Sequence, residues 1–208
     1  MDPNWAADHL QVIRTLMERS AVYRRALAPI MLFLGVLGLL AALAGWTLSV
    51  SKPWIFGGYW MGVSAVGISG AYLMVRRQAL RDGESFWSPP TRRVTQAALP
   101  SVSIGFVATI LILGTLQKDH LDVCWLPPLW MALYGSAIHA AGFFMPRGMK
   151  LFGWGFIFTS CLAAAALVFA LIPRSWGSSH LLMGACFGGL HLLYGIYLYF
   201  SEARKNEA

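Results

Sequence analysis

An apolar run of 23 residues, LFGWGFIFTSCLAAAALVFALIP at residues 151–173, decides the fold class of this chain. The run contains no Asp, Glu, Lys or Arg, and it ends at Pro173. A helix of about 20 apolar residues is long enough to cross the hydrocarbon core of a bilayer, which is roughly 30 Å thick. The run is therefore predicted to be a membrane-spanning helix.

Five further segments have the same character, and none of them contains Asp, Glu, Lys or Arg. The chain is 57% hydrophobic and only 12% charged, whereas soluble domains carry about 25% charged residues. The connections are short, so no separate soluble domain fits. We expect an all-α, integral membrane six-helix bundle with a single membrane domain at 26–200 and a tail at 201–208. The other five predicted spans are about 26–48, 53–75, 98–116, 123–145 and 180–200.

Residues 1–25 are predicted to form an amphipathic helix at the membrane surface. An apolar stripe that includes Leu10, Ile13 and Leu16 would face the lipid, and the polar face would stay in water. The same pattern is typical of a helix that docks a cytoplasmic partner, and this alternative stays open. Four basic residues are expected to contact anionic headgroups: Arg14, Arg19, Arg24 and Arg25.

The distribution of basic residues orients the predicted bundle. Lys and Arg accumulate in short cytoplasmic loops, and with a cytoplasmic N-terminus thirteen of the sixteen basic residues lie inside. Only Lys52, Lys118 and Arg174 then lie outside. Both termini are therefore predicted to be cytoplasmic, and the segment at about 76–97 is predicted to be a loop pressed onto the inner membrane surface.

Several classes of function have no support in the sequence. The net charge of +7 is not arranged on a basic helix face with interleaved aromatics, so nucleic acid is not an expected partner. The cysteines Cys124, Cys161 and Cys186 lack metal-ligand spacing. No phosphate-binding loop, nucleophile elbow or zinc-binding helix motif is present. We therefore predict a protein that is not an enzyme and has no cofactor.

Aromatic and small residues add expectations about packing. Six tryptophans, including Trp60 and Trp176, fall at or near predicted outer ends, where indoles prefer the headgroup boundary. His180 is likewise predicted to be an interfacial residue at an outer end. The glycine pairs Gly58/Gly62 and Gly184/Gly188 have the spacing that permits close helix approach. Self-association of the chain is an open alternative.

The even-numbered spans align weakly as a threefold repeat. Each has a Met followed by a small residue, and Ile or Leu with a polar residue seven and eight positions after the Met. Such a pattern predicts three copies of a helical hairpin. The three aligned polar residues are Ser69, His139 and His191, and we take them as a candidate intramembrane polar site.

Three interpretations of His139 and His191 compete. An ionisable residue at membrane depth is costly unless it is paired, so it is a functional hypothesis by default. The favoured interpretation is that each neutral imidazole makes hydrogen bonds across helices. Alternatively, the pair ligates a haem iron or another metal, or lines a path for a proton or small solute. The hydrogen-bonding partners named by the first interpretation are Ser136, Thr159, Ser160, Tyr194 and backbone carbonyl groups.

The stretches LMERS at residues 16–20 and YRRALAP at residues 23–29 carry one resemblance. They resemble the amino-terminal stretch of uncharacterised small multi-pass membrane proteins of bacteria. The resemblance implies a bacterial inner-membrane setting and brings no activity or functional residue with it.

Together these observations favour a multi-pass membrane protein with a non-enzymatic role. Three other functions remain open: a small-solute or proton permease with a polar path near His139 and His191, a haem- or metal-binding electron carrier, and a membrane anchor for a cytoplasmic regulator.

Overall fold

The computed structural model describes residues 27–83, 86–115, 123–145 and 148–206. Within these ranges the chain forms helices and no strands. The predicted surface helix at 1–25 and its predicted headgroup contacts lie outside the described residues.

The described chain consists of long helices joined by short connections. Five of its helical segments are long and apolar enough to cross a membrane, as expected of a multi-pass membrane protein. The helix α4 has 16 residues and so extends about 24 Å, which is shorter than the other five. The α6, η2 and α7 segments follow one another directly, and their span Trp176–Ser201 is one of the five. In chain order the elements are Leu27–Thr47, α2 (Pro53–Arg81), α3 (Pro89–Thr115), η1 (Val123–Trp125), α4 (Leu126–Ala141), α5 (Gly148–Val168), α6 (Trp176–Met183), the π-helix η2 (Gly184–Leu190) and α7 (His191–Asn206).

Local sequence signals set several of the helix ends. Pro53 begins α2. The first N–H groups of a helix have no partner within the helix, so a proline costs no hydrogen bond at this position. Gly83 follows the end of α2 with φ of 67°, a left-handed conformation that favours glycine. The hydroxyl of Ser175 accepts a hydrogen bond from the N–H of Ser178 at 3.2 Å and so caps α6.

The predicted loop at 76–97 is wrong in its extent. The α2 helix continues to Arg81, and α3 already begins at Pro89. Apolar composition marks the part of a helix that lies in hydrocarbon, whereas intrahelical hydrogen bonds can continue past that part. The connection between the two helices is therefore short.

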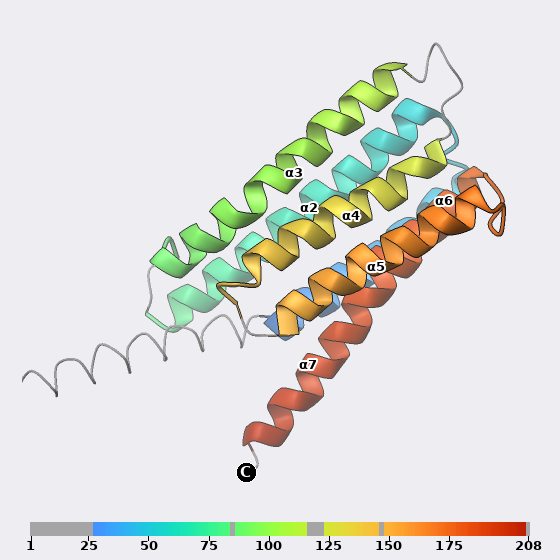
Figure 1. The fold of residues 1–208 in the computed structure, drawn as a ribbon. Coiled ribbons are helices and arrows are strands. Elements are labelled where there is room, and N and C mark those ends of the chain that lie inside the picture. The colour runs from blue at the N-terminus through green and yellow to red at the C-terminus, as the bar shows by residue number, and fades with distance from the viewer. Residues whose placement is uncertain (1–26, 84–85, 116–122, 146–147, 207–208) are drawn as a thin grey trace, which may run out of the picture.

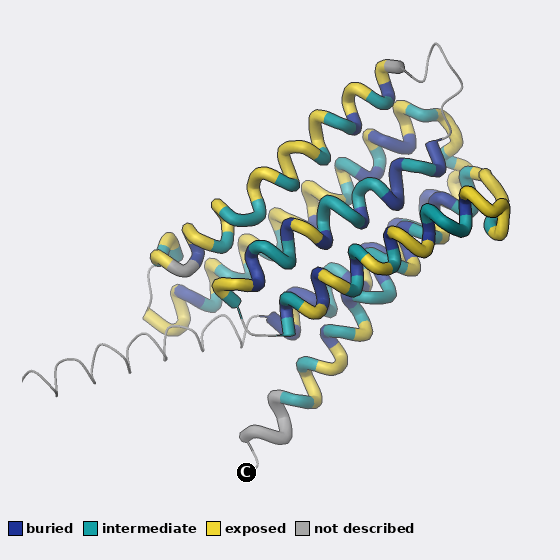
Figure 2. Tube along the Cα trace, in the orientation of Figure 1, coloured by how far each residue is buried: buried dark blue, intermediate teal, exposed yellow. Residues whose placement is uncertain are grey.

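The helices form a closed bundle with α3, α4 and α5 side by side in that order (Figure 1). On the other side of the bundle, α2 packs on the Leu27–Thr47 helix, with Gly70 against Phe33. The Leu27–Thr47 helix in turn packs on the span Trp176–Ser201. This span also packs on α5 through ring contacts such as that of Tyr194 with Phe152. Buried positions face the interior of this arrangement, and the exposed positions of α3 face away from it (Figure 2).

Gly184 and Gly188 permit a close approach to the Leu27–Thr47 helix. A Cβ on Gly188 would lie 2.7 Å from the backbone nitrogen of Leu39, and a Cβ on Gly184 would press on the side chain of Ala42. The packing role predicted for Gly184 and Gly188 is therefore confirmed. The prediction for the other pair is wrong within the described chain, because Gly58 and Gly62 are exposed and a Cβ on either meets no described atom within 4 Å.

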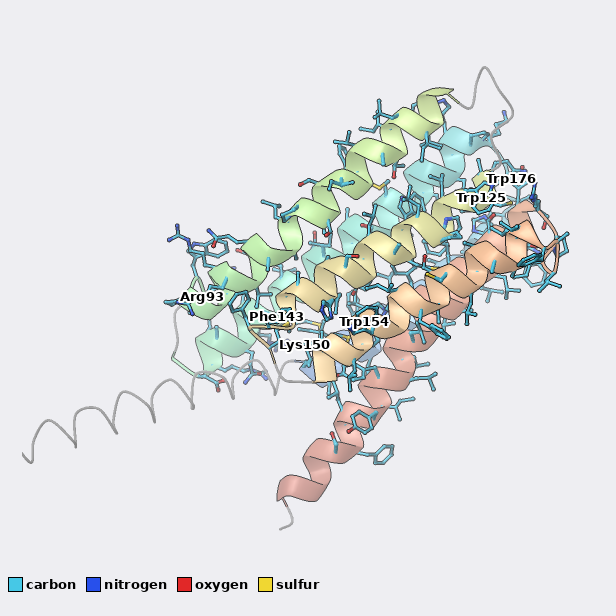
Figure 3. All side chains as sticks on the ribbon, in the orientation of Figure 1. Arg93, Trp125, Phe143, Lys150, Trp154 and Trp176 are labelled. Atoms are coloured by element: carbon cyan, nitrogen blue, oxygen red, sulfur yellow. The ribbon has the colours of Figure 1, made fainter. Side chains whose placement is uncertain are left out.

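The bundle has two ends that differ in character (Figure 3). Arg93 and Lys150 mark one end, which we call the Arg93 end, and Trp125 and Trp176 mark the other, which we call the Trp176 end. Two buried clusters fill the interior. One is centred on Phe152 and Phe156 and the other on Phe56 and Trp60, and each contains a histidine at its centre.

Candidate functional site

His191 is buried between three helices and makes a hydrogen bond with each of its ring nitrogens. It begins α7 directly after the π-helix η2 and is 2% exposed. Its Nδ1 lies 2.7 Å from the carbonyl oxygen of Phe187, and its Nε2 lies 2.7 Å from the hydroxyl of Tyr134 on α4. Because a carbonyl oxygen only accepts, Nδ1 donates, and Nε2 of the neutral ring then accepts from the Tyr134 hydroxyl. In its neutral form the ring is therefore the Nδ1–H tautomer.

Aromatic rings enclose His191. The ring centroids of Tyr134, Phe152 and Phe156 lie 5.4, 5.1 and 5.3 Å from that of the imidazole. Phe152 and Phe156 both meet the ring edge to face, and both are buried. Such surroundings are apolar, so an unpaired nitrogen here would be costly. The two hydrogen bonds remove that cost, and the bond to Tyr134 joins α7 to α4.

His180 forms a second buried centre, near the Trp176 end. It is 1% exposed. The indole Nε1 of Trp60 lies 3.3 Å from its Nδ1, and its Nε2 lies 3.1 Å from the carbonyl oxygen of Val50. An indole N–H can only donate, so Nδ1 accepts and Nε2 donates to Val50. His180 is therefore the neutral Nε2–H tautomer, the opposite of His191.

The surroundings of His180 are aromatic too. The ring centroids of Phe56, Tyr59 and Trp60 on α2 lie 5.0, 6.1 and 6.0 Å from its own. The hydroxyl of Tyr59 donates to the carbonyl oxygen of Ala41, which ties α2 to the Leu27–Thr47 helix. A Cβ on Gly45 would overlap the imidazole, so this glycine makes room for the ring.

The prediction that His180 is an interfacial residue is wrong, because its side chain is buried between helices. Trp60 is buried as well, at 4% exposed. Position along a helix gives depth but not the face that neighbouring helices cover. One signal in the sequence could have found the site. Phe56, Tyr59 and Trp60 have the i, i+3, i+4 spacing that places three aromatic rings on one face of α2.

The three predicted polar-site residues lie in different surroundings. Ser69 is exposed on α2. His139 is half-buried near the Arg93 end, where its ring meets Phe143 and Trp154 at centroid distances of 5.6 and 5.5 Å (Figure 3). Its Nδ1 lies 3.5 Å from the carbonyl oxygen of Lys150, at the limit of a hydrogen bond. Neither a hydrogen bond nor a ring contact joins any two of the three residues in the described chain.

The side chains expected to partner the histidines have other roles. Ser136 and Thr159 donate to carbonyl oxygens of their own helices, and Ser160 donates to the carbonyl oxygen of Pro128 at 2.7 Å. Tyr194 stacks on Phe152. Tyr134, which the sequence did not single out, takes the place predicted for them. Thus His191 does bond across helices, but with a different side chain.

The arrangement of these groups suits packing better than ligation. A metal at His191 would have to displace either the Tyr134 hydroxyl or the Phe187 carbonyl from the ring. Among the described residues no three His, Cys, Asp or Glu side chains gather as a metal site would require. All three cysteines are free, and they belong to different helical segments.

Similarity to other proteins adds no assignment to this geometry. Neither the protein-family models, nor the curated proteins, nor the solved structures contain a match to this chain.

Proposed function

We propose that this chain is a non-enzymatic, multi-pass membrane protein whose buried histidines hold the helices of the bundle together. The observation that carries the proposal is that both ring nitrogens of each buried histidine make a hydrogen bond. Each of His180 and His191 has one nitrogen donating to a backbone carbonyl and the other accepting from a side chain. A metal ligand needs a free lone pair on the ring, and these hydrogen bonds leave neither ring with one.

The packing around the two centres supports the same conclusion. Catalysis or transport requires room for a substrate next to the polar group. Around His191 that room is filled by Tyr134, Phe152 and Phe156, and around His180 by rings from α2 and by the close approach of Gly45. The interior of the described bundle is thus used for helix packing.

We further propose six membrane crossings, with both termini on the cytoplasmic side of a bacterial inner membrane. Charge asymmetry supports this orientation, because thirteen of sixteen basic residues then lie inside. The path of α4 supports the sixth crossing. It runs between α3 and α5, and it connects the end of α3 to the opposite end of the bundle, where α5 begins (Figure 1).

The optical spectrum and metal content of the purified protein, with its thermal stability, test the proposed function. Wild-type protein should show no Soret band and no stoichiometric metal, and His191→Ala should lower the unfolding temperature without changing the visible spectrum. His9→Ala, the same change in the segment predicted from the sequence to be a surface helix, serves as the control. A Soret band or bound metal that is lost in His191→Ala would overturn the proposal in favour of an electron carrier.

A further inference from the structure

A cluster of exposed arginines occupies the hairpin of α2 and α3 at the Arg93 end. The last turns of α2 and the first turns of α3 are antiparallel neighbours, joined by the connection at 82–88. Five guanidinium groups lie here within 18 residues of sequence, and every one of them is exposed. They belong to Arg76, Arg77, Arg81, Arg92 and Arg93.

These arginines have no counter-ion in the part of the chain that the structure describes. The described acid of the hairpin is Asp82, whose carboxylate accepts a hydrogen bond from the side-chain amide of Gln78 at 3.0 Å. Glu84, the other acid between residues 76 and 93, lies outside the described residues. The segment 76–93 therefore contains five arginines and two acidic residues, so the hairpin carries a local excess of positive charge.

An aromatic group lies beside the arginines on the bilayer side. Phe86, in the connection, folds back onto Tyr72 of α2 with ring centroids 4.6 Å apart. Tyr72 precedes Arg81 by nine residues, which corresponds to about 13 Å along the helix toward the middle of the membrane. Trp87 lies next to Phe86 and is 58% exposed. Aromatic side chains at this depth are typical of the boundary between headgroups and acyl chains.

The faces of α2 and α3 that lead away from the arginines are apolar and open. Leu73 and Leu80 on α2 and Leu99 on α3 are all more than half exposed. Figure 2 shows the outward side of α3 as largely exposed along its length. A ligand that has an anionic head and apolar chains would match the whole surface, whereas a free phosphate ion would match the arginines alone.

We propose that the α2–α3 hairpin binds an anionic glycerophospholipid, with the arginines on its phosphate and the acyl chains along α2 and α3. Guanidinium groups pair with phosphate through two parallel N–H donors, which gives geometric preference as well as charge attraction. Phe86 and Trp87 pack at the glycerol level. This binding is separate from the packing role of His180 and His191, which lie in the interior.

Competition between two lipids tests the proposal. The full chain in mixed micelles is offered equal amounts of phosphatidylglycerol and phosphatidylcholine, and the lipids that remain bound after purification are quantified by mass spectrometry. Wild-type protein should retain phosphatidylglycerol with at least about tenfold preference, since each basic residue at a membrane surface contributes about fivefold. Replacing the five arginines by glutamine should bring the ratio close to that offered.

Two further variants make the test specific. Replacing the five arginines by lysine keeps the charge and removes the paired donors, and should give an intermediate ratio. Lys52→Gln with Arg174→Gln removes charge at the Trp176 end and should leave the ratio as in wild type.

Two results would overturn the proposal. One is an unchanged lipid ratio in a folded five-glutamine variant. The other is loss of a co-purifying soluble protein at an unchanged lipid ratio, which would assign the arginines to a protein partner.

Discussion

The hydroxyl of Tyr134 on α4 lies 2.7 Å from Nε2 of His191. His191 is the first residue of α7 and directly follows the π-helical turn η2. A π-helical turn contains one more residue than an α-helical turn and therefore rotates the following helix. In this chain that rotation accompanies the pairing of His191 with the one tyrosine among its ring neighbours. The glycines of the turn also let it lie against the Leu27–Thr47 helix.

Tyr134→Phe should destabilise the bundle by about 1 kcal/mol, the size measured for hydrogen bonds between membrane helices. The change removes the donor to His191 and leaves the aromatic packing in place. The free energy of unfolding in mixed micelles measures the effect. Tyr199→Phe makes the same chemical change at an exposed position and should have no effect. An equal loss of stability in both variants would argue against the interhelical bond.

Trp60→Phe should loosen the Trp176 end locally. It removes the indole N–H that holds Nδ1 of His180. The neighbouring Ser179 donates to the thiol of Cys124 at 3.4 Å, and Cys124 is buried. A loss of about 1 kcal/mol in local stability raises the labelling rate of a buried thiol about fivefold. Maleimide labelling of Cys124, with Cys161 and Cys186 changed to Ala, measures this rate. Trp54→Phe alters an exposed indole and should leave the rate unchanged.

Gly153→Ala should cost about 1–3 kcal/mol, the usual range for overpacking. A Cβ on Gly153 would lie 2.7 Å from the backbone nitrogen of His139, and α4 and α5 would have to separate. Gly155 is the matched control on the same helix, because a Cβ there meets no described atom within 4 Å. Gly155→Ala should be neutral or stabilising by up to about 1 kcal/mol, since alanine favours helix. Equal thermal stability of the two variants would contradict the close contact of α4 with α5.

Fusions that report sidedness should place the C-terminus in the cytoplasm if α4 crosses the membrane and the N-terminus is cytoplasmic. Its 16 residues are fewer than most spans contain, but the adjoining η1 and the turn after Ala141 lengthen the path across the bundle. Alkaline phosphatase fused after Ala208 should be inactive, and green fluorescent protein at the same place should be fluorescent. The opposite pair of results would place the C-terminus outside and would contradict the proposed topology.

The sequence was sufficient to predict the helical membrane architecture, because the apolar runs are long and free of charge. It also placed His191 near the middle of a predicted span and suggested that its ring bonds across helices. The ends of α2 and α3 were predicted less well. Arg76 to Arg81 remain helical because backbone hydrogen bonds continue beyond the hydrocarbon, and the helix ends only near Gly83, which has a left-handed backbone.

The His180 centre escaped prediction for a different physical reason. Depth in the bilayer can be counted from the ends of an apolar run, but burial by neighbouring helices depends on how each helix is rotated. His180 is near a helix end and still buried, because α2 turns Phe56, Tyr59 and Trp60 toward it. Tyr134 was missed in the same way, since its face of α4 is set by the packing of α5 and α7.

Nitrogen-15 NMR of histidine-labelled protein in bilayers tests the central claim most directly, because it reports which nitrogen of each imidazole carries the proton. Spectra of His180→Gln and His191→Gln assign the two buried rings among the five histidines. We expect two neutral rings of opposite form at neutral pH, Nε2–H for His180 and Nδ1–H for His191. A charged imidazolium, a metal-shifted nitrogen, or the same tautomer at both positions would contradict it.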